Sequence, residues 1–109
     1  MDLALRRSTI GDTHVLMASG DIDLPSLPRF TDALVRLVAD APAGSVVVDL
    51  DGTGIVDDAA LGLLLGAAGR ARAGGGDLVV VSTEQRLRAR LADTGFDRAV
   101  KVTPSIAGS

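Results

Sequence analysis

The sequence contains no cysteine, tryptophan or tyrosine, and phenylalanines 30 and 96 are its only aromatic residues. The absence of cysteine excludes disulfide bonds, thiolate zinc sites and cysteine nucleophiles, and it is compatible with a reducing compartment. So few aromatic side chains provide no stacking platform for nucleic-acid bases. The formal net charge is −3 and the arginines are scattered, so the chain also lacks an extended basic patch. We therefore expect no nucleic-acid partner.

Long apolar runs are absent as well. No stretch approaches the ~20 apolar residues that span a bilayer. Residues 1–9 also lack the basic and then apolar pattern of a secretory signal. We therefore expect a cytoplasmic protein without membrane insertion. Because the chain has 109 residues, we expect one domain over residues 3–104, followed by a flexible tail over residues 105–109.

Hydrophobic residues make up 47% of the chain, and most are alanine, valine or leucine, which predicts a closely packed aliphatic core. Alternating apolar residues on either side of Gly11 and Asp12 predict two strands joined by a hairpin turn. Ser82 or Thr83 is a candidate N-cap for a helix that ends at Gly95. The other predicted helices span residues 25–40 and 57–73, and the other predicted strands span residues 46–50, 78–81 and 99–102.

The predicted order of elements is therefore β-β-α-β-α-β-α-β. In such an order the first two strands form an antiparallel hairpin, and the later strands are joined by helical crossovers. This favours an α/β fold with a small mixed sheet and with helices mainly on one face.

Residues 46–65 join the most apolar strand to the most apolar helix. The residues between them, 49–58, are rich in aspartate and glycine and are predicted to form a polar turn. In the helix, four apolar residues share one face, which we assign to the core: Leu61, Leu64, Leu65 and Ala68. The opposite face carries small residues, and each glycine there costs about 1 kcal/mol relative to alanine. We interpret this face as a partner surface that includes Ala59, Gly62, Leu63 and Gly66.

Several motifs resemble those of the STAS domain, whose bacterial members include anti-sigma factor antagonists. They are GDID at 20–23, VVVDL at 46–50, VDDAALGLLL at 56–65, GGGDLVVVS at 74–82 and LADTGFDRAVKV at 91–102. The resemblance implies a protein that binds an anti-sigma factor, a GHKL-type serine kinase, and so releases a sigma factor. It also implies no catalytic residue, no cofactor and no metal ion. The sequence leaves open the identity of the partner and whether the chain forms homo-oligomers.

One departure from the family pattern concerns the residue that the partner kinase phosphorylates. By the resemblance, Asp57 matches the motif's aspartate, whereas Asp58 occupies the place of the phosphorylated serine. Aspartate carries one negative charge, and phosphoserine carries roughly 1.5 to 2. Asp58 either holds the chain in a state like the phosphorylated, non-binding one or belongs to a chain whose partner tolerates the charge. Both aspartates would also suit the start of a helix, where carboxylates are favourable.

The GDID motif adds Asp21 and Asp23 to the candidate partner surface, because the resemblance places this loop toward the partner. Aspartates at the end of a strand are also common turn residues. His14 has no second histidine with which to form a metal site. Three arginines of the predicted last helix are expected on a solvated surface: Arg86, Arg88 and Arg90.

Two alternatives stay open. One is a STAS subunit of a transporter or a sensory complex. The other is a small magnesium-dependent phosphatase, because DLDGTG at 49–54 resembles the first motif of the haloacid dehalogenases. Asp49 would then attack phosphate, Asp51 would act as acid and base, and Ser82 would belong to the second motif. The chain after Asp51 lacks the acidic pair that such an enzyme needs for magnesium.

Overall fold

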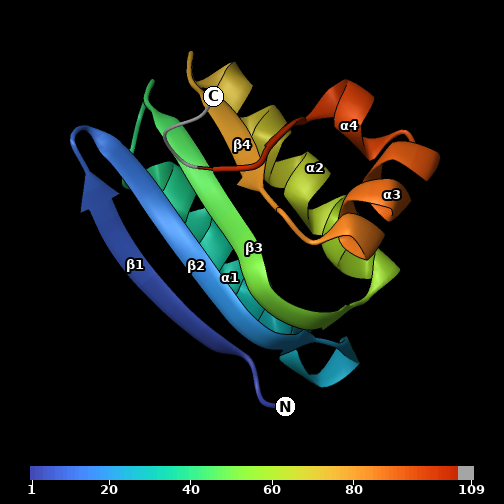
Figure 1. Cartoon of the computed structure of the whole chain (residues 1–109). Helices are drawn as coiled ribbons and strands as arrows, with labels where there is room; N and C mark the ends of the chain where they lie inside the picture. The colour runs from blue at the N-terminus through green and yellow to red at the C-terminus, as the bar shows by residue number, and fades with distance from the viewer. Residues whose placement is uncertain (106–109) are drawn as a thin grey trace.

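The computed structural model describes residues 1–105 as a five-stranded sheet with helices packed against it (Figure 1). The strands are β1 (Ala4–Ile10), β2 (Thr13–Ile22), β3 (Ser45–Val56), β4 (Asp77–Val81) and β5 (Lys101–Thr103). The helices are the 3-10 turn η1 (Leu24–Ser26), α1 (Leu27–Ala39), α2 (Asp58–Ala73), α3 (Gln85–Asp93) and α4 (Phe96–Ala99). Apart from Ser105, the expected tail over residues 105–109 lies outside the described residues.

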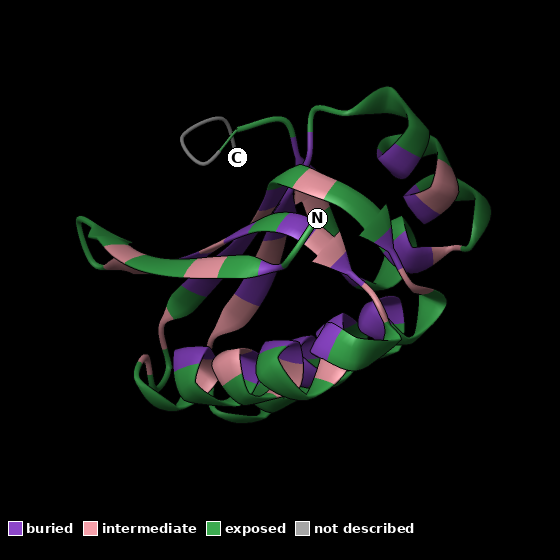
Figure 2. Ribbon diagram, turned by 90° about the horizontal axis from the view of Figure 1, so that it is seen from below, coloured by how far each residue is buried: buried purple, intermediate pink, exposed green. Residues whose placement is uncertain are grey.

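The strands lie in sequence order across the sheet, β1-β2-β3-β4-β5. β1 and β2 pair antiparallel, and each later pair is parallel. Parallel neighbours need crossover connections, which place helices over a sheet face. Figure 2 shows the two long helices, α1 and α2, along one side of the curved sheet, while the shorter helices lie apart from them at the upper right. The predicted α/β fold with a small mixed sheet and helices mainly on one face is confirmed.

The core lies between this face of the sheet and the helices. Val46, Val48 and Leu50 of β3 contribute to it and are 0–1% exposed. Val47 points to the opposite face, where it joins a smaller cluster with Val15 and Val81. Burial of β3 on both faces explains its run of β-branched residues. Within residues 1–105, no helix is long and apolar enough to cross a membrane.

The predicted turn over residues 49–58 is wrong, because β3 continues through it to Val56. The register with β2 moves from Met17 opposite Asp49 to Ser19 opposite Gly52, so β3 has one extra residue there. A second shift of the same kind follows before Val56. The polar and glycine residues of this stretch therefore form two β-bulges within a strand. Such bulges have a composition similar to that of a turn.

Side chains hold the backbone of these bulges. The Asp51 N–H donates to the Asp49 carboxylate over 2.9 Å, and the Ile55 N–H donates to the Asp21 carboxylate over 2.9 Å. The Thr53 hydroxyl donates to the Leu50 carbonyl over 2.6 Å. Backbone groups that lose their ladder partners at a bulge thus find side-chain partners.

Helix α2 is rotated relative to its predicted orientation. Leu65, assigned to the core, is 40% exposed, whereas Ala60 is fully buried. Leu61, Leu64 and Ala68 are buried as predicted, and the buried face also includes Ala67 and Ala71. Because α1 and α2 pack side by side, small alanines suit the contact surface between them better than a second leucine. The positions of the leucines alone therefore do not mark the centre of the buried face of α2.

The predicted N-cap of α3 is also wrong. Glu84 is the N-cap, and its carboxylate accepts the backbone N–H groups of Arg86 and Leu87 over 3.1 and 2.7 Å. Ser82 instead extends the sheet, since its N–H donates to the Thr103 carbonyl over 3.0 Å. A further short helix, α4, was not predicted.

Ser82→Ala is expected to stabilise the protein by about 1 kcal/mol. The Ser82 side chain is fully buried, and its hydroxyl has no hydrogen-bond partner within residues 1–105. Removal of a buried unsatisfied hydroxyl relieves its desolvation penalty. Urea unfolding of the two proteins measures the effect. A variant clearly less stable than the wild type would show that the hydroxyl has a partner in solution.

Candidate functional site

The candidate site is built around the junction between β3 and α2. Asp57 is the N-cap of α2, and its carboxylate accepts the Ala59 N–H over 2.8 Å. The Asp57 N–H donates to the Ile22 carbonyl at the end of β2 over 2.8 Å. The start of α2 is thereby tied to the end of β2, and Asp57 has the capping role that its residue type favours.

Asp58 is the first residue of α2, and its side chain is 88% exposed. Its carboxylate forms an ion pair with the guanidinium of Arg90 from α3. The same guanidinium donates to the Val56 carbonyl at the end of β3. Arg86 and Arg88 are exposed as expected, whereas the Arg90 side chain is only 33% exposed. Its pairing with a residue 32 positions away has no signal in the local sequence pattern.

The small-residue face of α2 is open to solvent. Ala59, Gly62 and Gly66 are exposed. A Cβ atom at Gly62 would have no atom within 4 Å outside the local helix, so close packing inside this domain does not account for that glycine. Leu63 is only partly exposed and packs against the main core, which makes it a marginal member of the predicted surface.

A groove of about 320 Å³ runs between α2 and α4 beside this face. Its apolar part is formed by Leu61, Leu65, Phe96 and Ala99, and Asp58 and Gly62 also line it. Leu65, expected in the core, thus forms part of the groove. The start of α2 therefore combines a charged pair, an open small-residue face and an apolar groove, which is suited to contact with another protein.

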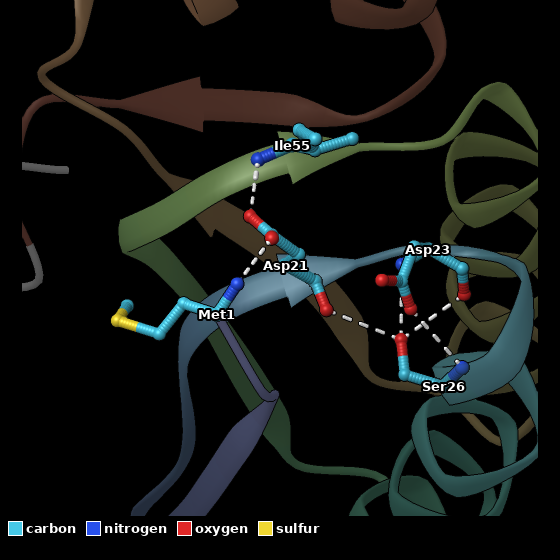
Figure 3. A network of polar contacts seen from close by, with 5 residues as sticks. All are labelled: Met1, Asp21, Asp23, Ser26 and Ile55. Carbon is cyan, nitrogen blue, oxygen red and sulfur yellow. Dashed lines mark hydrogen bonds and ion pairs between the residues drawn. The ribbon is translucent and has the colours of Figure 1, made fainter.

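Asp21, near the end of β2, and Asp23, which follows it, lie at the same end of the sheet as this junction (Figure 3). The Asp21 carboxylate forms an ion pair with the Met1 ammonium over 2.7 Å, and it also accepts a hydrogen bond from the Ile55 N–H. Asp23 caps η1: its carboxylate accepts the Ser26 N–H over 3.3 Å, and its N–H donates to the Ser26 hydroxyl over 2.9 Å. Both residues therefore have structural contacts, and their predicted role toward a partner stays a prediction.

Asp21→Asn is expected to reduce stability near neutral pH and to have little effect in strong acid. The Met1 ammonium and the Ile55 N–H hold the pKa of the Asp21 carboxyl below its ordinary value of 3.8. A carboxyl whose pKa is lower in the folded state than in the unfolded state stabilises the protein at pH values above its unfolded-state pKa. This stabilisation is lost as the pH falls through its folded-state pKa. Urea unfolding of both proteins from about pH 6 to about pH 2 measures the difference. An equal difference at every pH would contradict the prediction.

The two aspartates of the phosphatase alternative have contacts within the fold. The Asp49 carboxylate accepts the Asp51 N–H, and the Asp51 carboxylate accepts the N–H and hydroxyl of Thr83 over 2.6 and 3.0 Å. The open turn on which that alternative depended is a bulged strand. No group of three histidine, aspartate or glutamate residues within the described part of the chain is placed to hold a metal ion.

Comparison with known structures shows several similar folds. An anti-sigma factor antagonist from Mycobacterium paratuberculosis has a TM-score of 0.86 and 23% identity, over 96% of this chain and 88% of that one. The antagonist SpoIIAA in its unphosphorylated form has a TM-score of 0.75 and 14% identity, over 94% and 90%. The Bacillus SpoIIAA in its phosphorylated form has a TM-score of 0.69 and 14% identity, over 94% and 93%. At such identities the similarity establishes a shared fold.

Comparison of sequences is more specific. No curated protein matches the sequence at a significant level. A profile of the family described as "Mlab, STAS domain", however, matches residues 5–104, which is nearly the whole chain. The fold, a five-stranded mixed sheet with helices mainly on one face, agrees with this match. The chain therefore belongs to the STAS-domain family and resembles the anti-sigma factor antagonists.

Proposed function

We propose that this chain is an anti-sigma factor antagonist that binds a GHKL-type serine kinase in the cytoplasm and so releases a sigma factor. It acts by recognition and not by catalysis. The observation that carries the proposal is the open face at the start of α2, where Asp58 is 88% exposed and Gly62 has free space above it. Similarity to antagonist structures supports the same type of function.

The predicted contact surface joins this face to the end of β2. The Asp57 N–H donates to the Ile22 carbonyl, so Asp21 and Asp23 at the end of β2 adjoin the start of α2. An exposed glycine in the middle of a helix costs about 1 kcal/mol relative to alanine, and a use for the flat surface that it leaves would explain why it is kept. A partner backbone that approaches Gly62 closely would use that surface.

Substitution of Asp58 tests its role as the switch position. The experiment measures the affinity of the wild type, Asp58→Ser and Asp58→Ala for candidate GHKL-type anti-sigma kinases, by calorimetry. We expect nanomolar to micromolar binding and a different affinity for at least one variant. Only Asp58→Ser is expected to accept a phosphoryl group from ATP at this position, because serine restores the missing hydroxyl.

Asp12→Ser is the matched control. Asp12 is an exposed aspartate in the turn between β1 and β2, at the other end of β2 from Asp58. It is expected to leave the affinity and the phosphorylation unchanged. Equal affinities of wild type, Asp58→Ser and Asp58→Ala would exclude a switch role for this residue. If the wild type does not bind such a kinase at all, the alternative of a transporter or sensory subunit is favoured.

A further inference from the structure

The ion pair between Asp58 and Arg90 separates two grooves of the surface. Asp58 lines the groove between α2 and α4, and Arg90 lines a second groove of about 400 Å³ between the end of β3 and α3. Exposed apolar side chains flank the pair on each side, Leu65 in the first groove and Ile55 in the second. A partner that covers the start of α2 would therefore cover the pair as well.

Arg90 is held in place from two sides. One terminal nitrogen of its guanidinium donates to the Val56 carbonyl, and the other donates to the Asp58 carboxylate. The main-chain contact fixes the guanidinium at the end of β3, so little side-chain freedom is lost when it pairs with Asp58. Such a pair contributes little to stability while it is exposed to water. Its charge balance becomes important when a partner excludes water from it.

The charges at position 58 can be compared between this chain and a phosphorylated relative. The charge of Asp58 is balanced by the single positive charge of Arg90. A phosphoserine at the same place would carry roughly 1.5 to 2 negative charges, so the same arginine would leave an excess of about 0.5 to 1. The neighbouring Asp57 carboxylate is directed at the N–H groups of α2, whose partial positive charge offsets it.

We infer that Arg90 is a specificity-determining residue that neutralises Asp58, so that this chain presents the balanced charge of a binding-competent site and not the excess charge of a phosphorylated one. This inference rests on the proposed function, because it concerns the regulation of the same surface. Of the two roles considered for Asp58, this inference favours the second: Asp58 does not mimic the phosphorylated, non-binding state, and the partner tolerates its charge.

The decisive experiment measures the affinity of four proteins for the GHKL-type kinase: wild type, Arg90→Gln, Asp58→Asn and the double variant. Arg90→Gln leaves the Asp58 charge unbalanced in the interface and is expected to weaken binding at least about tenfold. Asp58→Asn leaves the Arg90 charge unbalanced instead and is expected to weaken binding as well. The double variant is expected to recover wild-type affinity, because it removes both charges. A purely structural role of Arg90 would not be rescued in this way.

Arg88→Gln is the matched control, since it removes the same charge two residues earlier on α3. Arg88 is exposed, lines neither groove and forms no ion pair within residues 1–105, so this variant is expected to change the affinity less than threefold. The inference is overturned if Arg90→Gln binds like the wild type, or if the double variant binds as weakly as Arg90→Gln.

A measurement without a partner keeps this test separate from that of the proposed function. In the NMR spectrum, the guanidinium nitrogen signals of Arg90 are expected to shift in Asp58→Asn, while those of Arg88 do not. If the wild type binds no kinase, the proposed function fails, and this spectrum alone decides whether Arg90 neutralises Asp58. Unchanged Arg90 signals would overturn the inference.

Discussion

Gly62→Leu is expected to weaken binding of the anti-sigma partner at least about thirtyfold without destabilising the protein. Gly62 lies on the exposed face of α2, and a Cβ atom there would meet no atom within 4 Å outside the local helix. Leucine also favours a helix by roughly 0.5 to 1 kcal/mol relative to glycine, so the free energy of unfolding should be unchanged or higher. A bulky side chain on a close-contact surface costs on the order of 2 kcal/mol or more of binding free energy.

The matched control is Gly69→Leu. Gly69 lies on the same helix and also has open space where a Cβ would be. It is seven residues further along, or roughly 10 Å along the axis, beyond the predicted surface. Calorimetric titration with the kinase and urea unfolding of both variants distinguish binding from stability. If Gly62→Leu binds as tightly as the wild type, the small-residue face is not the contact surface.

Leu64→Ala is expected to reduce the free energy of unfolding by about 2–5 kcal/mol. Leu64 is fully buried in the main core, where α2 packs on the sheet and on α1. Alanine leaves a cavity that the surrounding aliphatic side chains fill only in part. Since single domains of this size have only about 5–15 kcal/mol in total, the loss is a large fraction of the stability. Urea unfolding followed by circular dichroism measures it.

Leu65→Ala is the control for this prediction. Leu65 has the same side chain one position further along α2 but is 40% exposed. Less apolar surface is lost from the core, so we expect a reduction of less than about 1 kcal/mol. The opposite ranking of the two variants would show that Leu65 faces the core, as the spacing of leucines first predicted.

The hairpin, the later strands and the first two helices could be predicted from local patterns. The β-branched run at residues 46–48 lies in β3, and the predicted helices over 25–40 and 57–73 correspond to α1 and α2. Such patterns are local because the side-chain period of a strand or a helix is set by its own backbone. Short elements escaped them: α4 has only four residues, too few to show a period.

Tertiary contacts alone decided other features. Residues 49–56 have the composition of a turn, but pairing with β2 keeps them in a strand, and the Asp21 carboxylate supplies a bond that the bulge lacks. The rotation of α2 depends on its packing with α1, which local spacing does not encode. In both cases the deciding partner lies at least about twenty residues away along the chain.

The sequence by itself determined the order of elements, the aliphatic core and the aspartate at position 58. Those features follow from residue types and from spacing along one segment. Only the tertiary structure decided that Arg90 stands beside Asp58 and that Leu65 lines a groove. The charge that a partner meets at position 58 is the sum of two side chains 32 residues apart, because the fold brings α3 to the start of α2.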